Sequence, residues 1–583
     1  MHKMKIFFGS LLHRLAASNT EHIIWFGVIV LIMIILAVLH HKWKGDDKKI
    51  RLWRVLCLLP LIAAGIHAYI YLPGFPLLVM GFFPIYIIAV FALLPIPFAK
   101  RKIGYKIASV ITGLMTCLLG FYFLGTSPFY FNHSRESYSD SFRSLVRDMD
   151  RNYVLKEWKE IDFAALEAKY LPMIREAERD NDVGKFTDAV EMFCSELHDG
   201  HVPVLTEDEK IKYASYTSAY VPHEYGLAMV QLDNDDVIAV CTADDVHKLG
   251  IEDGTVITKW NGKPVLQACA EDVPDIGMSV KSNADRIAAI VLSGIGGETV
   301  DVSFIDKNGS EQTVTLSELG EPHTQLEAFR AYRHFEKLGE KDEGQSLLDE
   351  NFGTKMLDDK CGYLRLSAEA TDNGLYDMLV GYMMADHAQA REMFREKLRD
   401  LKAQGMEYLV IDLRNNEGGY DEIANALCDL LTTDEWYGQG LGIRENGQYR
   451  CASDHGIYGD GEFADLKAVA LTNFGCLSAG DGASLYLSRL PNVTLAGITD
   501  PYGCNQETGG ISVLSGGDVI VGYPVGLILD ETGVPNIDTR ADRISRDPVE
   551  VRIPLDFDAA MKIFRGKEDY ELEWAVKYLE EQG

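Results

Sequence analysis

Residues 408–419 read Tyr-Leu-Val-Ile-Asp-Leu-Arg-Asn-Asn-Glu-Gly-Gly, and this stretch decides the fold of the second half of the chain. Its apolar first half predicts a buried strand, and the residues after Gly419 predict a helix over roughly 422–431. Strands that alternate with helices indicate an α/β domain. Two glycines at a strand-to-helix junction can leave main-chain N–H groups free to face a ligand, which is what an oxyanion hole requires.

A second strand-to-helix junction follows further along the chain. Residues 468–473 predict a strand, and a helix is expected from the Ser-Ala-Gly-Asp of 478–481 through Leu490. Ser478 would then lie at a helix N-terminus, where the helix dipole stabilises developing negative charge and where a nucleophile would be placed. Serine is also a common helix N-cap, so the residue type alone leaves both interpretations open.

Two segments with different sequence patterns precede these junctions. Residues 135–222 have helical patterning and include Leu-His-Asp-Gly-His at 197–201. Residues 223–318 predict short strands and turns. There, Leu-Gly-Ile-Glu-Asp-Gly at 249–254 and Trp-Asn-Gly at 260–262 resemble a PDZ domain, with Gly226 and Leu227 where the carboxylate-binding loop would lie. A PDZ domain binds an extended peptide by adding it to a sheet edge.

The first 126 residues predict a membrane anchor of four transmembrane helices. They contain apolar stretches at roughly 23–39, 55–72, 77–97 and 107–124, none of which includes an Asp, Glu, Lys or Arg. About 20 apolar residues suffice to cross a bilayer. We therefore expect a multi-pass protein of the cell membrane that contacts lipid through these N-terminal helices.

The charges of the connecting loops predict the orientation. The loop after the first stretch holds six Lys and Arg residues and the loop after the third holds four, whereas the loop between them has none. Loops rich in Lys and Arg stay in the cytoplasm, so residues 127–583 are expected outside it. Lys3, Lys5 and Arg14 oppose this orientation.

Charge also limits the partners of the soluble part. The 583-residue chain has a net charge of −31, and residues 1–126 contain 13 Lys and Arg but 3 Asp and Glu, which leaves −41 for the remainder. Such a domain would repel the phosphates of a nucleic acid. The ten cysteines form no Cys-x-x-Cys pair, so no structural metal site is expected.

Taken together, these stretches resemble peptidase family S41, which includes C-terminal processing and tricorn-core-like peptidases. The resemblance covers roughly residues 140–582 and includes Gly-Ile-Thr-Asp-Pro-Tyr-Gly at 497–503 and the tail at 566–576. It implies a crotonase-like α/β superhelix (ClpP/crotonase type) and a serine endopeptidase that hydrolyses peptide or protein substrates without a metal or cofactor. We expect a transmembrane anchor at 1–126, a helical peptidase part at 127–222, a PDZ-like domain at 223–318, a linker at 319–358 and the catalytic domain at 359–583.

The resemblance also implies catalytic roles for single residues. Cys504 stands where the C-terminal processing enzymes have their catalytic Lys, and no Lys occurs from Ala468 to Met561, which disfavours a Ser–Lys dyad. The tricorn-like branch implies Ser478 as nucleophile, His201 as base and Glu531 as the carboxylate that orients it. It further implies an oxyanion hole made by the main-chain N–H groups of Gly418 or Gly419 and of Ala479.

Several alternatives stay open at the level of sequence. His198 competes with His201 for the role of base, and Cys476 and Cys504 leave a thiol role open. Glu417, Asp481 and Asn536 depart from the usual family pattern. The alternative function is a catalytically inactive, PDZ-bearing adaptor at the cell surface.

Overall fold

A computed structural model gives the arrangement of the chain. It describes residues 20–71, 79–126, 129–206, 223–319, 324–334, 341–342, 345–346, 351–371, 387–445, 448–529, 533–535 and 549–582. Glu531 and Asn536 lie outside these residues, as do parts of the expected lead-in and linker.

The catalytic half contains a mainly parallel sheet. Its strands run in the order β11 (Thr354–Met356), β12 (Cys361–Arg365), β13 (Tyr408–Asp412), β16 (Lys467–Leu471), β17 (Val493–Gly497) and β20 (Val551–Arg552), and β11 is the antiparallel member. The helices of this half are α17 (Ala388–Ala403), α18 (Asp421–Leu431), α19 (Ala479–Ser488), α20 (Phe557–Ala560) and α21 (Tyr570–Gln582). The α/β expectation is confirmed, whereas the crotonase-like superhelix stays a prediction.

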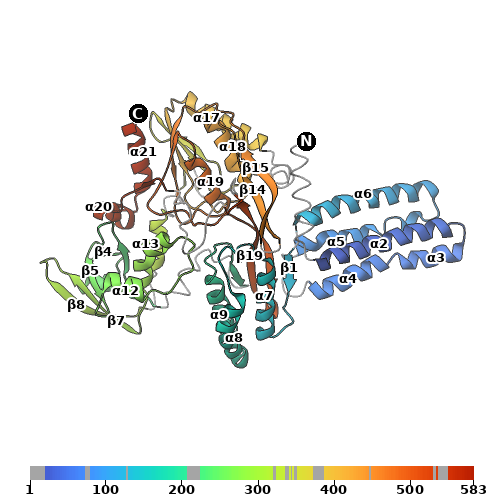
Figure 1. The fold of residues 1–583 in the computed structure, drawn as a ribbon, viewed down its shortest axis with the longest axis horizontal. Coiled ribbons are helices and arrows are strands. Elements are labelled where there is room, and N and C mark those ends of the chain that lie inside the picture. The colour runs from blue at the N-terminus through green and yellow to red at the C-terminus, as the bar shows by residue number, and fades with distance from the viewer. Residues whose placement is uncertain are drawn as a thin grey trace.

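A second sheet joins distant parts of the chain. Its order is β1 (Phe129–Asn132), β18 (Gln506–Val513), β19 (Val519–Leu529), β14 (Trp436–Glu445) and β15 (Gln448–Ile457), and β2 (Val204–Thr206) pairs with β19. The lead-in helices α7 (Tyr138–Asn152), α8 (Phe163–Asp180) and α9 (Val183–Ser195) share an apolar cluster with β19. They lie beside β19 in Figure 1. The second sheet thus holds the end of the lead-in against the catalytic half.

A separate β-rich unit follows the lead-in. Its sheet runs β3 (Ala228–Gln231), β4 (Val237–Val240), β5 (Val256–Trp260), β7 (Thr299–Ile305) and β8 (Glu311–Ser317), and β6 (Lys263–Pro264) pairs with β5. Its helices are α11 (Asp244–His247), α12 (Val265–Glu271) and α13 (Lys281–Leu292), and α14 (Thr324–Tyr332) follows in the expected linker. The β-rich character agrees with the expectation, and the PDZ assignment stays a prediction.

The N-terminal helices lie side by side at one end of the molecule (Figure 1). They are α2 (Thr20–Trp43), α3 (Asp47–Leu56), α4 (Leu59–Tyr71), α5 (Val79–Phe91) and α6 (Lys102–Thr126). In the described part of the chain, three helical segments are long and apolar enough to cross a membrane: Ile24–Trp43, Asp47–Tyr69 and Lys102–Gly120. The apolar helix Pro84–Phe98 is shorter, so the expected count of four spans is not confirmed.

The helical bundle contacts the second sheet. Val513 of β18 and Ile520 of β19 share an apolar cluster with Ile29 and Leu119 of the bundle. Arg135 donates from Nη2 to the main-chain oxygen of Tyr69 at 2.6 Å, and its guanidinium lies 4.2 Å from the centre of the Tyr69 ring. The second sheet therefore connects the bundle with the catalytic half.

Candidate active site

The loops that carry the expected site residues meet at one edge of the parallel sheet. β12, β13, β16 and β17 run in the same direction, so the loops that leave their carboxyl ends gather at that edge. These loops comprise residues 366–371, 413–420, 472–478 and 498–505. Both strand-to-helix junctions of the sequence analysis therefore lie next to each other.

Ser478 has a strained main chain and does not cap its helix. Its φ of 60° and ψ of −132° fall in a region that residues other than glycine rarely adopt, and its side chain makes no capping hydrogen bond with α19. Strain of this kind is retained where the surrounding structure enforces it, and it clusters at functional sites. The geometry therefore argues against the N-cap interpretation.

The glycine loop after β13 lies directly against Ser478. A Cβ atom on Gly418 would come within 2.6 Å of the Ser478 Cβ and 2.7 Å of the Ala479 nitrogen, and Gly418 has a φ of +87°. The Gly418 N–H donates to Asn416 Oδ1 at 2.8 Å. Among the described residues, no acceptor faces the N–H of Gly419 or of Ala479. These two donors, rather than that of Gly418, are free to face a substrate.

Asparagine side chains tie the two loops together. Asn415 N donates to Asn473 Oδ1 at 3.0 Å, and Asn473 Nδ2 donates back to Asn415 Oδ1 at 3.2 Å. Asn416 accepts the Leu477 N–H at its main-chain oxygen at 2.9 Å. The position of the glycine loop is thus fixed relative to the serine loop on both sides of the contact.

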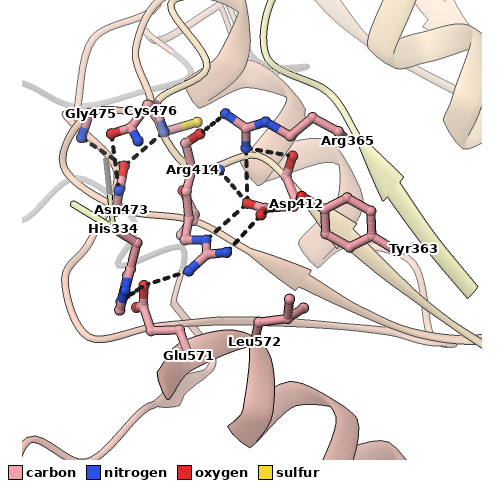
Figure 2. Close-up of polar contacts among 12 residues, drawn as sticks. His334, Tyr363, Arg365, Asp412, Arg414, Asn473, Gly475, Cys476, Glu571 and Leu572 are labelled. Carbon is pink, nitrogen blue, oxygen red and sulfur yellow. Dashed lines mark hydrogen bonds and ion pairs between the residues drawn. The ribbon is translucent and has the colours of Figure 1, made fainter. Parts of the chain in front are cut away.

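A buried ion cluster lies at the start of the glycine loop, and Figure 2 shows its side chains. Arg414 donates to both oxygens of Asp412, at 3.0 and 2.7 Å, and Arg365 donates to Asp412 Oδ1 at 3.0 Å. All three side chains are fully buried. Burial alone would raise the pKa of Asp412, but the charges of Arg414 and Arg365 outweigh it and hold this pKa below its ordinary value.

The C-terminal tail completes this cluster. Arg414 also donates to both oxygens of Asp569, at 2.6 and 2.9 Å, and contacts Glu571 at 3.4 Å. His334 Nε2 lies 3.1 Å from Glu571 Oε2 (Figure 2). Glu571 Oε1 accepts the N–H of Ile498, at the start of the fourth loop. The tail thereby fixes two of the loops at the site.

His201 is a buried imidazole with one free nitrogen. Its Nδ1 lies 3.0 Å from Gln506 Oε1, an acceptor, so this bond requires the proton on Nδ1. The Nε2 atom is buried and has no hydrogen-bond partner among the described residues. Burial lowers the pKa of His201, although the nearby Asp199 carboxylate opposes this. The ring is thus neutral near pH 7, with a lone pair on Nε2.

His198 has a different environment. Its Nε2 lies 2.7 Å from Asp275 Oδ2 of the β-rich unit, and its side chain is partly exposed. Lys159 Nζ donates to the main-chain oxygens of Leu197 and His198 and so holds the turn before His201. The geometry favours His201 over His198 as the base.

Cys504 is the contact between the serine and the histidine segments. The Ser478 N–H donates to the Cys504 oxygen at 2.9 Å. On the other side, a Cβ on Gly200 would lie 3.1 Å from the Cys504 Sγ. Asp481 of α19 holds this turn, because its Oδ2 accepts the N–H of Cys504 at 2.7 Å and also that of Gly503.

The cysteines near the serine are poor candidates for a nucleophile. Both Cys476 and Cys504 are fully buried. Burial raises the pKa of Cys476 to about 12 and that of Cys504 well above its ordinary value. The thiolate is the reactive form of cysteine, and it is scarcely populated at such pKa values.

The expected peptide-binding loop of the β-rich unit is engaged by the chain itself. The Gly226 N–H donates to Glu224 Oε1 at 2.7 Å, and Leu227 is fully buried. The same carboxylate accepts the N–H and the hydroxyl of Thr324. Addition of a peptide strand here would require Glu224 to move.

Several residues of the site escaped sequence analysis. Asp199 lies within the Leu-His-Asp-Gly-His stretch and accepts both the His201 N–H and the Tyr153 hydroxyl, so its position was visible. Gln506 and Asn473 carry no local signal of their roles. Within the described residues, no group of His, Cys, Asp and Glu side chains is arranged to hold a metal ion.

Comparison with known proteins identifies the class. Residues 360–540 match the model of peptidase family S41. This segment holds the strands β12, β13, β16 and β17, the glycine loop and Ser478. The match confirms the resemblance and the class of a serine-type peptidase. A search of the curated proteins gave no match.

Solved structures of similar proteins include other proteases. A photosystem II D1 C-terminal processing protease is 19% identical, with 73% of this chain and 97% of that chain covered and a TM-score of 0.32. Mature CPAF in complex with lactacystin is 14% identical, with coverages of 77% and 98% and a TM-score of 0.48. A putative peptidase from Parabacteroides merdae is 13% identical, with coverages of 76% and 97% and a TM-score of 0.39.

Proposed function

We propose that the chain is a membrane-anchored serine endopeptidase that cleaves peptide or protein substrates by a Ser–His–Glu mechanism. The observation that carries this proposal is the conformation of Ser478. Its main chain is strained, its side chain does not cap α19, and a Cβ added to Gly418 would lie 2.6 Å from the Ser478 Cβ. A nucleophile on a sharp strand-to-helix turn presents its hydroxyl to a substrate, and the loop beside it supplies oxyanion donors.

In the proposed reaction, Ser478 Oγ attacks the scissile carbonyl carbon and transfers its proton to His201 Nε2. The N–H groups of Gly419 and Ala479 stabilise the oxyanion, and His201 then protonates the leaving amine. A water molecule activated by the same imidazole hydrolyses the acyl-enzyme. The Nδ1–H group of His201 donates a hydrogen bond to Gln506 Oε1, and this leaves Nε2 unprotonated and basic.

Glu531 is the proposed carboxylate partner of His201. The support is topological, because β19 ends at Leu529 and its Leu527 pairs with Gln506, the residue that bonds His201. Glu531 follows two positions after Leu529 in the sequence. Gln506 would then be an additional orienting group.

Active-site labelling tests the proposal. The full chain, purified in detergent, should react with a serine-directed fluorophosphonate and cleave a peptide library, whereas Ser478→Ala should do neither. Ser488→Ala is the matched control, since Ser488 lies at the other end of α19 and donates to Leu485 O. If wild type cleaves nothing and is not labelled, the chain is instead a catalytically silent adaptor.

We further propose that the soluble part lies outside the cytoplasm. The basic charges lie around the junction of α2 with α3, from Lys42 to Arg54, and around the start of α6, from Lys100 to Lys106, which favours a cytoplasmic position for both. Protease added to intact cells should then digest residues beyond Thr126. Complete protection until the cells are permeabilised would reverse the orientation.

The β-rich unit is proposed either to dock substrates or to gate the site. Gating is supported by its contacts with both halves of the site. Ser279 Oγ donates to the His198 oxygen at 2.8 Å, and Asn283 Nδ2 donates to the oxygens of Asp500 and Pro501 at 3.0 and 2.9 Å. Deletion of residues 223–318 should change small-peptide turnover if the unit gates, and only protein cleavage if it docks.

A further inference from the structure

Arg333 lies beside the nucleophile loop and takes no part in the proposed reaction. It follows α14, and its guanidinium lies against the main chain of Gly475, three residues before Ser478. A Cβ on Gly475 would come within 2.5 Å of Arg333 Nη2 and 2.8 Å of its Nε. The guanidinium of Arg333 is therefore packed against this loop. Any residue larger than glycine at position 475 would displace it.

The position of this cation is fixed from two sides. Arg333 Nε donates to Asn415 Oδ1 at 2.7 Å, and Asn415 Nδ2 donates to the main-chain oxygen of Arg333 at 3.1 Å. The next residue, His334, is buried in the ion cluster with Glu571 (Figure 2). The backbone of Arg333 is thus anchored, and its side chain is held on the loop that leads to Gly418.

The guanidinium carbon of Arg333 lies 5.8 Å from the centre of the Phe474 ring, and its charge is only partly matched by its neighbours. A guanidinium has five N–H donors, and the hydrogen bond from Nε to Asn415 goes to a neutral amide. Among the described residues, no carboxylate oxygen lies within ion-pair distance of this side chain. Burial lowers the pKa of Arg333, an effect that the charge of Glu417 partly opposes. A partly desolvated guanidinium with spare donors favours a carboxylate ligand.

Glu417 is the acidic residue whose charge acts on Arg333. It immediately precedes Gly418, which touches Ser478. Its side chain is exposed, and partial desolvation raises its pKa while Arg333 opposes this. A substrate carboxylate that approaches Ser478 along this loop would contact Arg333. The exposed side chain of Glu417 would then turn toward solvent.

We propose that Arg333 is a specificity-determining residue that binds a carboxylate of the substrate, either an acidic side chain or a free C-terminus. The proposal rests on the proposed peptidase function, because the carboxylate would be bound while the peptide lies at Ser478. The soluble part carries a net charge of −41, so non-specific electrostatics oppose acidic peptides and any preference for them must come from a local site.

Binding to the full chain with Ser478→Ala, in detergent, separates recognition from cleavage. Three fluorescent peptides of equal length are compared by anisotropy: one amidated with an internal glutamate, one without acidic residues but with a free C-terminus, and one neutral and amidated. Each is measured with Arg333, Arg333→Gln and Arg333→Lys. Arg330→Gln is the matched control, because Arg330 is exposed on α14, the helix that Arg333 follows.

The expected result is that one of the two carboxylate peptides binds about tenfold or more tightly than the neutral peptide. The preference should vanish in Arg333→Gln, persist in part in Arg333→Lys and survive in Arg330→Gln. Which of the two peptides responds identifies the source of the carboxylate. A free C-terminus held by the β-rich unit instead would bind equally with and without Arg333.

An unchanged ratio of affinities in Arg333→Gln, for both carboxylate peptides, overturns the proposal, as does the absence of any preference in the Arg333 protein. Cleavage assays of the Ser478 enzyme distinguish the two proposals. Cleavage with an Arg333-independent preference leaves the peptidase function standing, whereas Arg333-dependent binding without any cleavage leaves only the carboxylate site.

Discussion

The main-chain N–H of Ser478 donates to the carbonyl oxygen of Cys504 at 2.9 Å, and this bond joins the nucleophile loop to the turn against which Gly200 packs. The proposed nucleophile and Gly200, the residue before the proposed base, therefore both lie against the segment 502–504. Their relative position depends on the turn at 503–504. The Asp481 carboxylate holds this turn by accepting two of its main-chain N–H groups.

Asp481→Asn should flatten the pH dependence of stability. Burial raises the pKa of Asp481 to about 7 in the folded chain, against 3.8 for an ordinary aspartate. The folded chain thus binds an extra proton between these values, and the stability from this proton is complete below 3.8 and lost as pH rises through about 7. Relative to Asp481→Asn, the wild-type Tm should fall on the order of 5 °C between pH 5 and pH 8.

Thermal melts at several pH values check this prediction. The asparagine oxygen can still accept the N–H groups of Gly503 and Cys504, so the variant should fold. The exposed Asp245→Asn is the control and should follow the wild-type curve. Parallel curves for wild type and Asp481→Asn would show that this carboxyl does not titrate as described.

Gly418→Ala should impair both catalysis and folding. The new methyl group would lie 2.6 Å from the Ser478 Cβ, and alanine is strained at a φ of +87°. We expect kcat/KM to fall at least about 100-fold and the free energy of unfolding to fall by about 1–3 kcal/mol. Gly297→Ala is the control, because nothing lies within 4 Å of its added Cβ. Equal activity of the two variants would refute the close contact.

The rise of activity with pH at the acidic end of the pH profile should reflect the deprotonation of His201. Burial lowers the pKa of this imidazole, so the neutral, basic form persists to lower pH than for an ordinary histidine. Activity should therefore rise with pH through a midpoint below 6.5. His201→Ala should abolish turnover while His198→Ala retains it, as measured by initial rates from pH 4 to 9. A rise only at alkaline pH would indicate an amine base.

Arg414→Gln should destabilise the catalytic domain by about 3–5 kcal/mol, because it removes the buried guanidinium that Asp412, Asp569 and Glu571 share and leaves Arg365 as the remaining arginine at Asp412. Arg399→Gln removes an exposed ion pair with Glu462 and should cost less than about 1 kcal/mol. Denaturant unfolding compares them, and similar losses for both would show that the cluster contributes no more than a surface pair.

The parts of the fold that were predictable from sequence depend on neighbouring residues. The apolar run of 408–413 appears as β13, and the Ser-Ala-Gly-Asp junction appears as the start of α19. A strand, a glycine turn and a helix start are each specified within about ten residues, so the pattern contains the information.

The remaining site contacts join residues that are far apart in the chain. Gln506 lies 305 positions from His201, and Asp569 lies 155 positions from Arg414. These pairs follow from the order of strands in two sheets, which no local pattern specifies. The sequence left Gly418 and Gly419 as alternative oxyanion donors, and Asn416, whose amide oxygen accepts the Gly418 N–H, favours Gly419. Glu531 stays a prediction, since it lies outside the described residues.

The strand β18 connects the proposed active site with the N-terminal helical bundle. One end, Gln506, bonds His201, and the other end, Val513, packs in the apolar cluster with the N-terminal helices. Eight residues of strand at about 3.3 Å each span roughly 25 Å. Under the proposed membrane anchoring, and with β18 perpendicular to the bilayer, a substrate anchored in the same membrane would need an extended segment of roughly eight residues between its own helix and the scissile bond. The fold would then select membrane-bound substrates by the length of the segment outside the membrane.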